Sequence, residues 1–173
     1  MELRSYQKND AKVILTWIKD EREFRLWSAD RYGDYPITPD DINDNYEKSK
    51  EISNFYPLTL VDDDKVIGHL ILRNPDNNKD VIRMGFIIVD HSIRGKGYGK
   101  VLINAAIKYA KETLHVKEIN LGVFTCNDGA LHCYQSVGFE IVEIEKNAYK
   151  FYDENWDCAE MILKYRWILT NKC

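Results

Sequence analysis

The stretch RGKGYG (residues 94–99) follows a mostly apolar run, VIRMGFIIVD (residues 81–90), and precedes a helical pattern of apolar residues over 101–110. The order predicts a buried strand, a glycine-rich turn and a long helix. The first free N–H groups of such a helix can bind a phosphate, and glycine lets the backbone approach it without a Cβ in the way. The turn is therefore a candidate phosphate loop.

Two familiar phosphate loops do not fit this turn. A Walker A loop needs a lysine followed by serine or threonine, whereas Lys100 is followed by Val101. A dinucleotide loop needs GxGxxG after the first strand of its unit, and here Gly95, Gly97 and Gly99 place the third glycine one residue early. Two interpretations stay open: a pyrophosphate site at the helix N-terminus, or a tight turn with solvated basic residues.

A second informative segment is NDGALHCYQSVGF (residues 127–139). It predicts a short helix with Asn127 as its N-cap and Gly138 as its C-terminal stop. Asn127, Ala130 and Tyr134 are spaced by three and four residues, so they share one helical face. An amide and a phenol on that face could line one extended ligand; alternatively, Tyr134 is a core tyrosine.

The remaining patterns predict a mixed α/β protein in the order β-α-α-β-β-β-α-β-α-β-β, forming one domain over residues 1–173. Helices are expected over 10–20, with Asn9 as N-cap, and over 39–48, with Thr38 as N-cap. The aromatic-rich segment over 24–37 is expected to be a structured loop or short helix. Strands are expected over 2–6, 55–61, 65–73, 81–90, 118–124 and 139–145, and around 159–167.

Composition excludes several classes of function. The net charge of −4 argues against a broad basic face for nucleic acid. No apolar run is long enough to span a membrane, and the charged N-terminus does not resemble a secretion signal, so we expect a cytoplasmic protein. The four cysteines form no CxxC pair, which predicts reduced thiols and no zinc or other metal site.

Taken together, the two segments resemble a known family. R-x-x-G-x-G after an apolar strand, followed about thirty residues later by N-x-x-A-x-x-x-Y-x-x-x-G-F, resembles the GNAT superfamily of N-acetyltransferases. The element order and the terminal hairpin are also similar to its ribosomal-protein and aminoglycoside acetyltransferase branches. The resemblance implies a mixed, mostly antiparallel sheet of six to seven strands with about four helices. It also implies acetyl-CoA as co-substrate.

The resemblance assigns roles to residues that match the family's motifs. Backbone groups of the preceding strand would bind the pantetheine arm, the glycine loop would hold the pyrophosphate, and one amide would contact the arm. Tyr134 would be the general acid that protonates the leaving sulfur. The implied cofactor-binding residues are Ile87, Ile88, Val89, Arg94, Gly95, Lys96, Gly97, Tyr98, Gly99, Lys100 and Asn127.

The implied chemistry is direct attack in a ternary complex. An amine attacks the thioester carbonyl, and a backbone N–H of the 87–89 segment stabilises the developing oxyanion. A phenol with a pKa of about 10 supplies the proton that the departing thiolate needs. The reaction requires no metal.

The general base is not at either position that relatives use. Some relatives place a glutamate five residues before the matching asparagine, where this chain has Gly122; others place one on the fourth strand, which offers Arg83 and then no acid until Asp90. The remaining candidates are Glu23, Asp30, Asp34, His69 and Glu160, or a water molecule.

The acceptor is a small-molecule or peptide amine. The segments over 24–36 and 149–161 combine acids with aromatic residues, which suits a cationic amine through ion pairs and cation–π contacts. These aromatics are Trp27, Tyr32, Tyr35, Tyr149, Tyr152 and Trp156. Alternatively they pack the rim of the domain or a dimer interface, so the chain is expected to be a monomer or homodimer. A CoA-binding sensor or scaffold without turnover is the alternative function.

Overall fold

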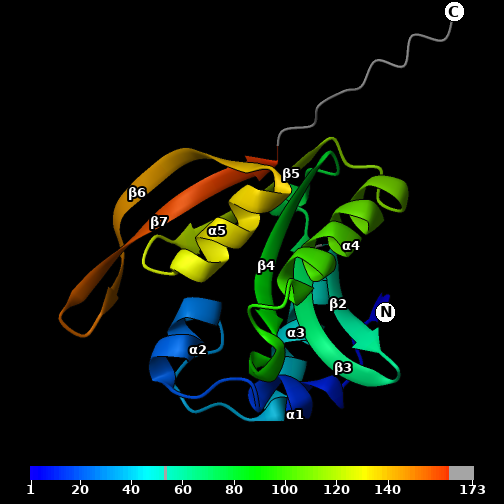
Figure 1. Ribbon diagram of the computed structural model, residues 1–173, viewed down its shortest axis with the longest axis horizontal. Coiled ribbons are helices and arrows are strands. Elements are labelled where there is room, and N and C mark those ends of the chain that lie inside the picture. The colour runs from blue at the N-terminus through cyan, green and yellow to red at the C-terminus, as the bar shows by residue number, and fades with distance from the viewer. Residues whose placement is uncertain (53, 164–173) are drawn as a thin grey trace, which may run out of the picture.

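The computed structural model describes residues 1–52 and 54–163, and these contain one seven-stranded sheet (Figure 1). Its strand order is β1-β2-β3-β4-β5-β7-β6, with every neighbouring pair antiparallel except β4 and β5. The strands are β1 (Glu2–Ser5), β2 (Phe55–Asp62), β3 (Lys65–Arg73), β4 (Val81–Val89), β5 (Glu118–Phe124), β6 (Phe139–Phe151) and β7 (Glu154–Leu163). The predicted mixed α/β class is confirmed. The end of the last predicted strand, beyond residue 163, lies outside the described residues.

The described residues form five α-helices, one more than the predicted order contained. They are α1 (Asp10–Leu15), α2 (Glu21–Ser28), α3 (Pro39–Ile52), α4 (Tyr98–Glu112) and α5 (Asp128–Val137). Two short 3₁₀ turns, η1 (Pro75–Asn77) and η2 (His91–Ile93), flank β4. Within the described residues, no helix is long and apolar enough to cross a membrane.

The additional helix is α2, which begins directly after the segment predicted as the first helix and extends into the segment predicted as a structured loop or short helix. The first helix, α1, ends at Leu15 rather than at residue 20. Asp20 is the N-cap of α2, because its side chain accepts a hydrogen bond from the Glu23 amide at 2.8 Å. Asn9 occupies the predicted N-cap position of α1, but its side chain makes no capping bond. The Asp10 carboxylate instead accepts the Gln7 amide at 2.9 Å.

The start of α3 agrees with its sequence signal, although the helix extends to Ile52 rather than ending near Lys48. The Thr38 amide donates to Asp41 Oδ2 at 2.7 Å, and the Asp41 amide lies 3.4 Å from Thr38 Oγ1. This reciprocal arrangement satisfies two amides that a helix start would leave free. The cap holds α3 where it can cover β2 and β3.

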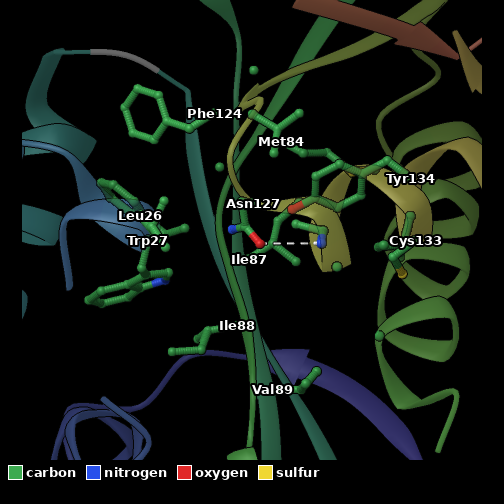
Figure 2. Close-up of a pocket in the computed structure, with 18 of the residues that line it drawn as sticks. Leu26, Trp27, Met84, Ile87, Ile88, Val89, Phe124, Asn127, Cys133 and Tyr134 are labelled. Carbon is green, nitrogen blue, oxygen red and sulfur yellow. Dashed lines mark hydrogen bonds between the residues drawn. The ribbon is translucent and has the colours of Figure 1, made fainter. Parts of the chain in front are cut away.

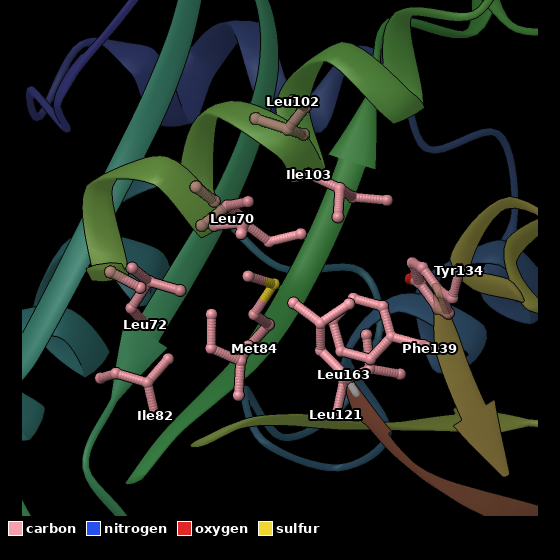
Figure 3. Packing of buried hydrophobic residues seen from close by; sticks show 14 of the residues in the cluster. Leu70, Leu72, Ile82, Met84, Leu102, Ile103, Leu121, Tyr134, Phe139 and Leu163 are labelled. Atoms are coloured by element: carbon pink, nitrogen blue, oxygen red, sulfur yellow. The ribbon is translucent and has the colours of Figure 1, made fainter. Parts of the chain in front are cut away.

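The main core lies between one face of the sheet and the pair α4 and α5. Leu70 and Met84 project from β3 and β4 toward Leu102 and Ile103 of α4, and all four are at most 2% exposed (Figure 3). The opposite face of β2 and β3 is covered by α1 and α3 through a smaller cluster that includes Tyr46. Helices on both faces therefore fix β3 and β4, which form the floor of the site.

The parallel strands β4 and β5 separate soon after they meet. They pair only over residues 81–84 and 118–121, and β5 continues along β7 instead. From Gly85 to Val89 the edge of β4 that faces β5 has no strand partner among the described residues. Unpaired backbone groups in a protein interior need other partners, so this edge is suited to hold an extended ligand.

A β-bulge on β4 changes the direction of its side chains. Gly85 pairs with Ile71 and Ile88 pairs with His69, so two residues of β4 oppose one of β3, and Phe86 has a positive φ of 50°. Phe86 consequently packs on the α1–α3 side, whereas Met84 and Ile87 pack on the α4 side. The bulge gives the two faces of β4 different linings just where the strands diverge.

The long hairpin of β6 and β7 swings away from β4 (Figure 1), and its outer end rests against α2. Arg22 of α2 pairs with Glu154 and lies 5.1 Å from the ring of Trp156. Tyr149 donates to Asp30 at 2.9 Å. The hairpin thus positions α2 at the mouth of the gap between β4 and β5.

Candidate active site

A cleft of about 760 Å³ occupies the gap between β4 and β5. Figure 2 shows that side chains from α2, Leu26 and Trp27, lie on one side of β4, while Cys133 and Tyr134 of α5 lie on the other. The cleft therefore has two differently lined ends that meet at the free edge of β4. We refer to them as the loop end, beside α4 and α5, and the α2 end.

The glycine-rich loop forms the wall of the loop end. Gly95 and Gly97 have φ values of 77° and 89°, a left-handed conformation that disfavours any residue with a Cβ. Gly97 is the N-cap of α4, and the first intrahelical bond runs from the Val101 amide to the Gly97 carbonyl at 3.2 Å. The backbone amides of the first α4 residues, before Val101, have no intrahelical acceptor and so could bind an anion.

The third glycine serves helix packing. A Cβ on Gly99 would lie 3.3 Å from Cys133 Sγ, so glycine lets α4 approach α5. Lys100 also lines the cleft, whereas Lys96 and Tyr98 do not; Lys96 is exposed and Tyr98 packs against the main core. Two of the seven predicted loop residues therefore lie outside the cleft lining.

Arg94 lines the cleft and is engaged in an ion pair. Its Nη1 donates to Glu23 Oε1 of α2 at 3.0 Å, and Glu23 Oε2 accepts the Lys19 amide at the same distance. The sequence predicts one of these side chains as a phosphate ligand and the other as a candidate base. The structure brings them together across the mouth of the cleft.

The predicted pantetheine residues all line the cleft. Ile87, Ile88 and Val89 belong to the part of β4 that β5 leaves unpaired. Their backbone groups are thus exposed at the junction of the two ends, where an extended arm could add to the sheet edge. This placement agrees with the arrangement that the sequence resemblance implies, while the binding role stays a prediction.

Asn127 caps the helix that follows β5, as the sequence predicts. Its Oδ1 accepts the Ala130 amide at 3.3 Å (dashed line in Figure 2), and its own amide donates to the Phe124 carbonyl at 2.9 Å. Its Nδ2 has no acceptor among the described residues, although the side chain lines the cleft. Capping orients the amide group, so that one N–H₂ donor remains available for a ligand.

Tyr134 is 7% exposed and lines the loop end. Figure 2 shows its hydroxyl directed away from α5 toward β4, and its ring makes an edge-on contact with Phe139 at 6.3 Å between centroids. The hydroxyl has no hydrogen-bond partner in the described part of the chain. Burial raises the pKa of Tyr134, and the neighbouring Cys133 adds to the effect, so the phenol keeps its proton near neutral pH.

Cys133 also lines the cleft, but its surroundings do not activate a thiolate. Burial raises the pKa of the Cys133 thiol, and the charge of Lys100 opposes this shift only in part. Cys158, at the α2 end, shows the same effect of burial on its pKa. Both thiols are therefore neutral side chains of the cleft wall.

Of the five candidate bases, only Glu23 lines the cleft. Asp34 is exposed, and Asp30 accepts from Arg25 at 2.9 Å and from Tyr149. His69 is fully buried behind β3, where its Nε2 bonds to Tyr46 Oη at 2.6 Å. Burial lowers the pKa of His69 to about 3, so its imidazole is neutral.

Glu160 is tied to Arg83 across three strands. Its two carboxylate oxygens accept from Arg83 Nη1 and Nη2 at 2.6 and 2.8 Å. A Cβ on Gly122, which lies between them, would be 2.6 Å from Arg83 Nη2 and 3.0 Å from Glu160 Oε1. The guanidinium thus occupies the space above Gly122, which explains why no longer side chain stands there.

The aromatic residues proposed for acceptor binding mostly pack against one another. Trp27 lines the cleft and stacks on Tyr32 at 5.2 Å, while Tyr149 and Trp156 pack under the β6–β7 hairpin. The sequence analysis did not identify Arg31 and Arg73 at the α2 end. They come from a loop and from the end of β3, so no local spacing signals that they meet.

These features define an architecture, a mixed seven-stranded sheet in which β4 and β5 diverge beside a glycine-rich helix start. A solved structure with this fold is the spermidine N-acetyltransferase from Vibrio cholerae in complex with CoA and spermine. It aligns with a TM-score of 0.77 over 93% of both chains, at 21% identity. At that identity the likeness concerns the fold.

The chain belongs to the acetyltransferase (GNAT) family, whose sequence model matches residues 18–139. It is 27% identical over 99 residues to the spermine/spermidine N(1)-acetyltransferase of Bacillus subtilis, covering 54% of this chain and 65% of that one. It is 41% identical over 69 residues to an uncharacterized N-acetyltransferase of Methanocaldococcus jannaschii, covering 39% of this chain and 30% of the relative. The matches thus span less than two thirds of either relative. The predicted family is confirmed, and its ribosomal-protein or aminoglycoside branch stays a prediction.

Proposed function

We propose that this chain transfers the acetyl group of acetyl-CoA to a primary amine. The observation that carries the proposal is that one cleft joins the glycine loop, the unpaired edge of β4 and the hydroxyl of Tyr134. Bound acetyl-CoA would supply the acyl group as a thioester. The amides that open α4, together with Lys100, would hold its pyrophosphate, and the 87–89 segment would hold its pantetheine arm.

Tyr134 is the general acid of this proposal. Its raised pKa keeps the phenol protonated, and its hydroxyl has no competing acceptor among the described residues. It can therefore donate its proton to the departing sulfur. A backbone N–H at the free edge of β4 would stabilise the oxyanion, since such donors are fixed before the reaction begins.

Water is the proton acceptor in this proposal. Both oxygens of Glu23 and both oxygens of Glu160 already accept hydrogen bonds, which leaves these carboxylates poorly placed to take the proton of the amine. The cleft is open to solvent at Arg94, which is exposed. An amine that arrives neutral, or loses its proton to water, needs no side-chain base.

The relatives named above leave polyamines as the first acceptors to test, and a sensor without turnover as the alternative. The test measures thiol release from acetyl-CoA with a panel of diamines, amino carboxylates and peptide N-termini, for the wild-type protein and Tyr134→Phe. We expect turnover that falls at least about tenfold in the variant, while acetyl-CoA affinity is kept. Unchanged turnover would remove Tyr134 as the acid. Acetyl-CoA binding without turnover on any amine would favour the sensor.

A further inference from the structure

The α2 end of the cleft continues into a side pocket of about 170 Å³ between α3 and β3. Arg31, Ile71, Arg73 and Phe86 line both the cleft and the side pocket, so the two spaces are continuous. Asn45 and Ser49 of α3 contribute the other polar groups, and no acidic residue among those described lines it. The side pocket, a branch of the α2 end where the acceptor would bind, therefore combines hydrogen-bond donors with apolar side chains.

Arg31 and Arg73 bring two positive charges to the side pocket. Neither guanidinium forms an ion pair with a described carboxylate. Every other arginine in the described part of the chain does so: Arg4, Arg22, Arg25, Arg83 and Arg94. Unpaired cations placed together in a partly buried pocket are unfavourable unless an anion joins them.

The two arginines are also close enough to repel each other. Burial lowers the pKa of half-buried Arg73, and the positive charges of Arg31 and Arg83 lower it further, while the charge of Asp76 opposes these effects only in part. Arg31 is exposed, but its carbonyl accepts Asn45 Nδ2 at 3.0 Å, which ties this loop residue to α3. The backbone of Arg31 is therefore held beside the side pocket.

A third donor at this end also lacks a partner. The indole N–H of Trp27 is buried without an acceptor among the described residues, and Figure 2 shows this nitrogen turned toward β4. The only carboxylate of the described cleft lining is Glu23, which lies one turn before Trp27 on α2 and is already paired with Arg94. The α2 end thus offers hydrogen-bond donors and positive charge, whereas a polycation would need free carboxylates.

We propose, building on the transferase function above, that the acceptor is a primary amine that also carries a carboxylate or phosphate group. The anionic group binds between Arg31 and Arg73 in the side pocket, and the amine extends to the junction beside β4. The planar forks of two arginines suit the oxygens of either anion. This class of acceptor differs from the polyamines for which the relatives are named.

The test measures equilibrium binding to the CoA-saturated protein by calorimetry, so it does not depend on turnover. A series of amino carboxylates, beginning with γ-aminobutyrate, is compared with diamines of equal length such as putrescine. A second arm compares phosphoethanolamine with ethanolamine and so distinguishes phosphate from carboxylate. We expect at least one anionic amine to bind at least about tenfold tighter than its matched partner.

Variants then locate the anion. Arg73→Gln and Arg31→Gln should each abolish the preference and leave CoA binding unchanged, and Arg73→Lys should keep part of it. Lys48→Gln removes a charge from α3 without touching the pocket, so it should have no effect. Diamines that bind as tightly as every anionic partner, or a preference that survives both glutamine variants, would overturn the proposal. Loss of turnover on all amines would instead count against the transferase function alone.

Discussion

Arg94 of the glycine-rich loop donates to Glu23 of α2 at 3.0 Å, and this ion pair closes one mouth of the cleft. It joins the segment expected to bind phosphate to the helix that borders the acceptor end. A bound pyrophosphate would compete with Glu23 for the same guanidinium. If the loop binds the pyrophosphate as proposed, the pair would lower the affinity for acetyl-CoA by the cost of separating it.

Glu23→Gln should accordingly tighten acetyl-CoA binding. Both side chains are partly exposed, at 41% and 27%, so the effect should be modest, a decrease in Kd of about two- to fivefold. Calorimetric titration measures it, with Glu21→Gln as a control, because Glu21 pairs with Arg25 outside the loop. Weaker binding in Glu23→Gln would mean instead that the carboxylate orients Arg94 for the phosphate.

Gly97→Val should abolish acetyl-CoA binding beyond what backbone strain explains. Valine is disfavoured at a φ of 89°, and its side chain would project from the loop that is expected to hold the pyrophosphate. Gly33, in the loop after α2, has a φ of 87° and equally open surroundings, so Gly33→Val is a matched control for strain. Thermal unfolding should show both variants destabilised, while only Gly97→Val loses the upward shift that acetyl-CoA gives. A retained shift would remove the loop from the binding site.

The parts of the site that could be predicted from the sequence are those encoded locally. The glycine loop, the cap at Asn127 and the placement of Tyr134 each depend on residues within one or two helical turns. Gly85 in a strand pattern is a known signal of a bulge, so the turn of Phe86 toward α3 was also open to prediction. The start of α2 is signalled by Asp20, an N-cap residue at the end of the segment predicted as the first helix.

Features built from distant segments could not be predicted in this way. Arg31 and Arg73 are forty-two positions apart in the numbering, and only the packing of α3 on β3 brings them to one pocket. His69 carried a plausible chemical signal as a base, yet the alternation of β3 turns it into the interior. Glu160 was likewise a candidate base, but it forms a salt bridge with Arg83, and this partner could not be foreseen because it lies on another strand.

The rate of acetyl transfer should follow the ionisation of the acceptor rather than that of a protein carboxylate. If water accepts the proton, kcat/KM rises with pH up to the pKa of the amine, so the inflection moves when acceptors of different pKa are compared. Burial raises the pKa of Tyr134, so loss of its proton should cause no decline up to about pH 10. An inflection that stays at the same pH when the acceptor is changed, and that disappears in Glu160→Gln, would identify a carboxylate base.

Gly122→Ala should destabilise the fold by about 1–2 kcal/mol, because the new methyl group displaces the Arg83 guanidinium from Glu160. Urea unfolding measures the loss. Gly129→Ala is the matched control: its position on α5 is open, and alanine favours a helix more than glycine does. An unchanged midpoint for Gly122→Ala would mean that the ion pair shifts at no cost and does not determine the residue there.

Stability should fall on acidification because His69 cannot take up a proton in the folded state. Its pKa is about 3 when folded, through burial, against about 6.5 in an unfolded chain, so the unfolded state binds more protons between these values. The contribution of His69 is therefore complete above about pH 6.5 and is lost progressively as the pH falls toward 3. Its slope approaches about 1.4 kcal/mol per pH unit. Urea unfolding at pH 7, 6 and 5 (with the slope of His69→Gln subtracted) isolates this term. An NMR titration of the His69 imidazole provides a second measurement that needs no variant, and a titration midpoint near 6.5 in the native protein would contradict the prediction.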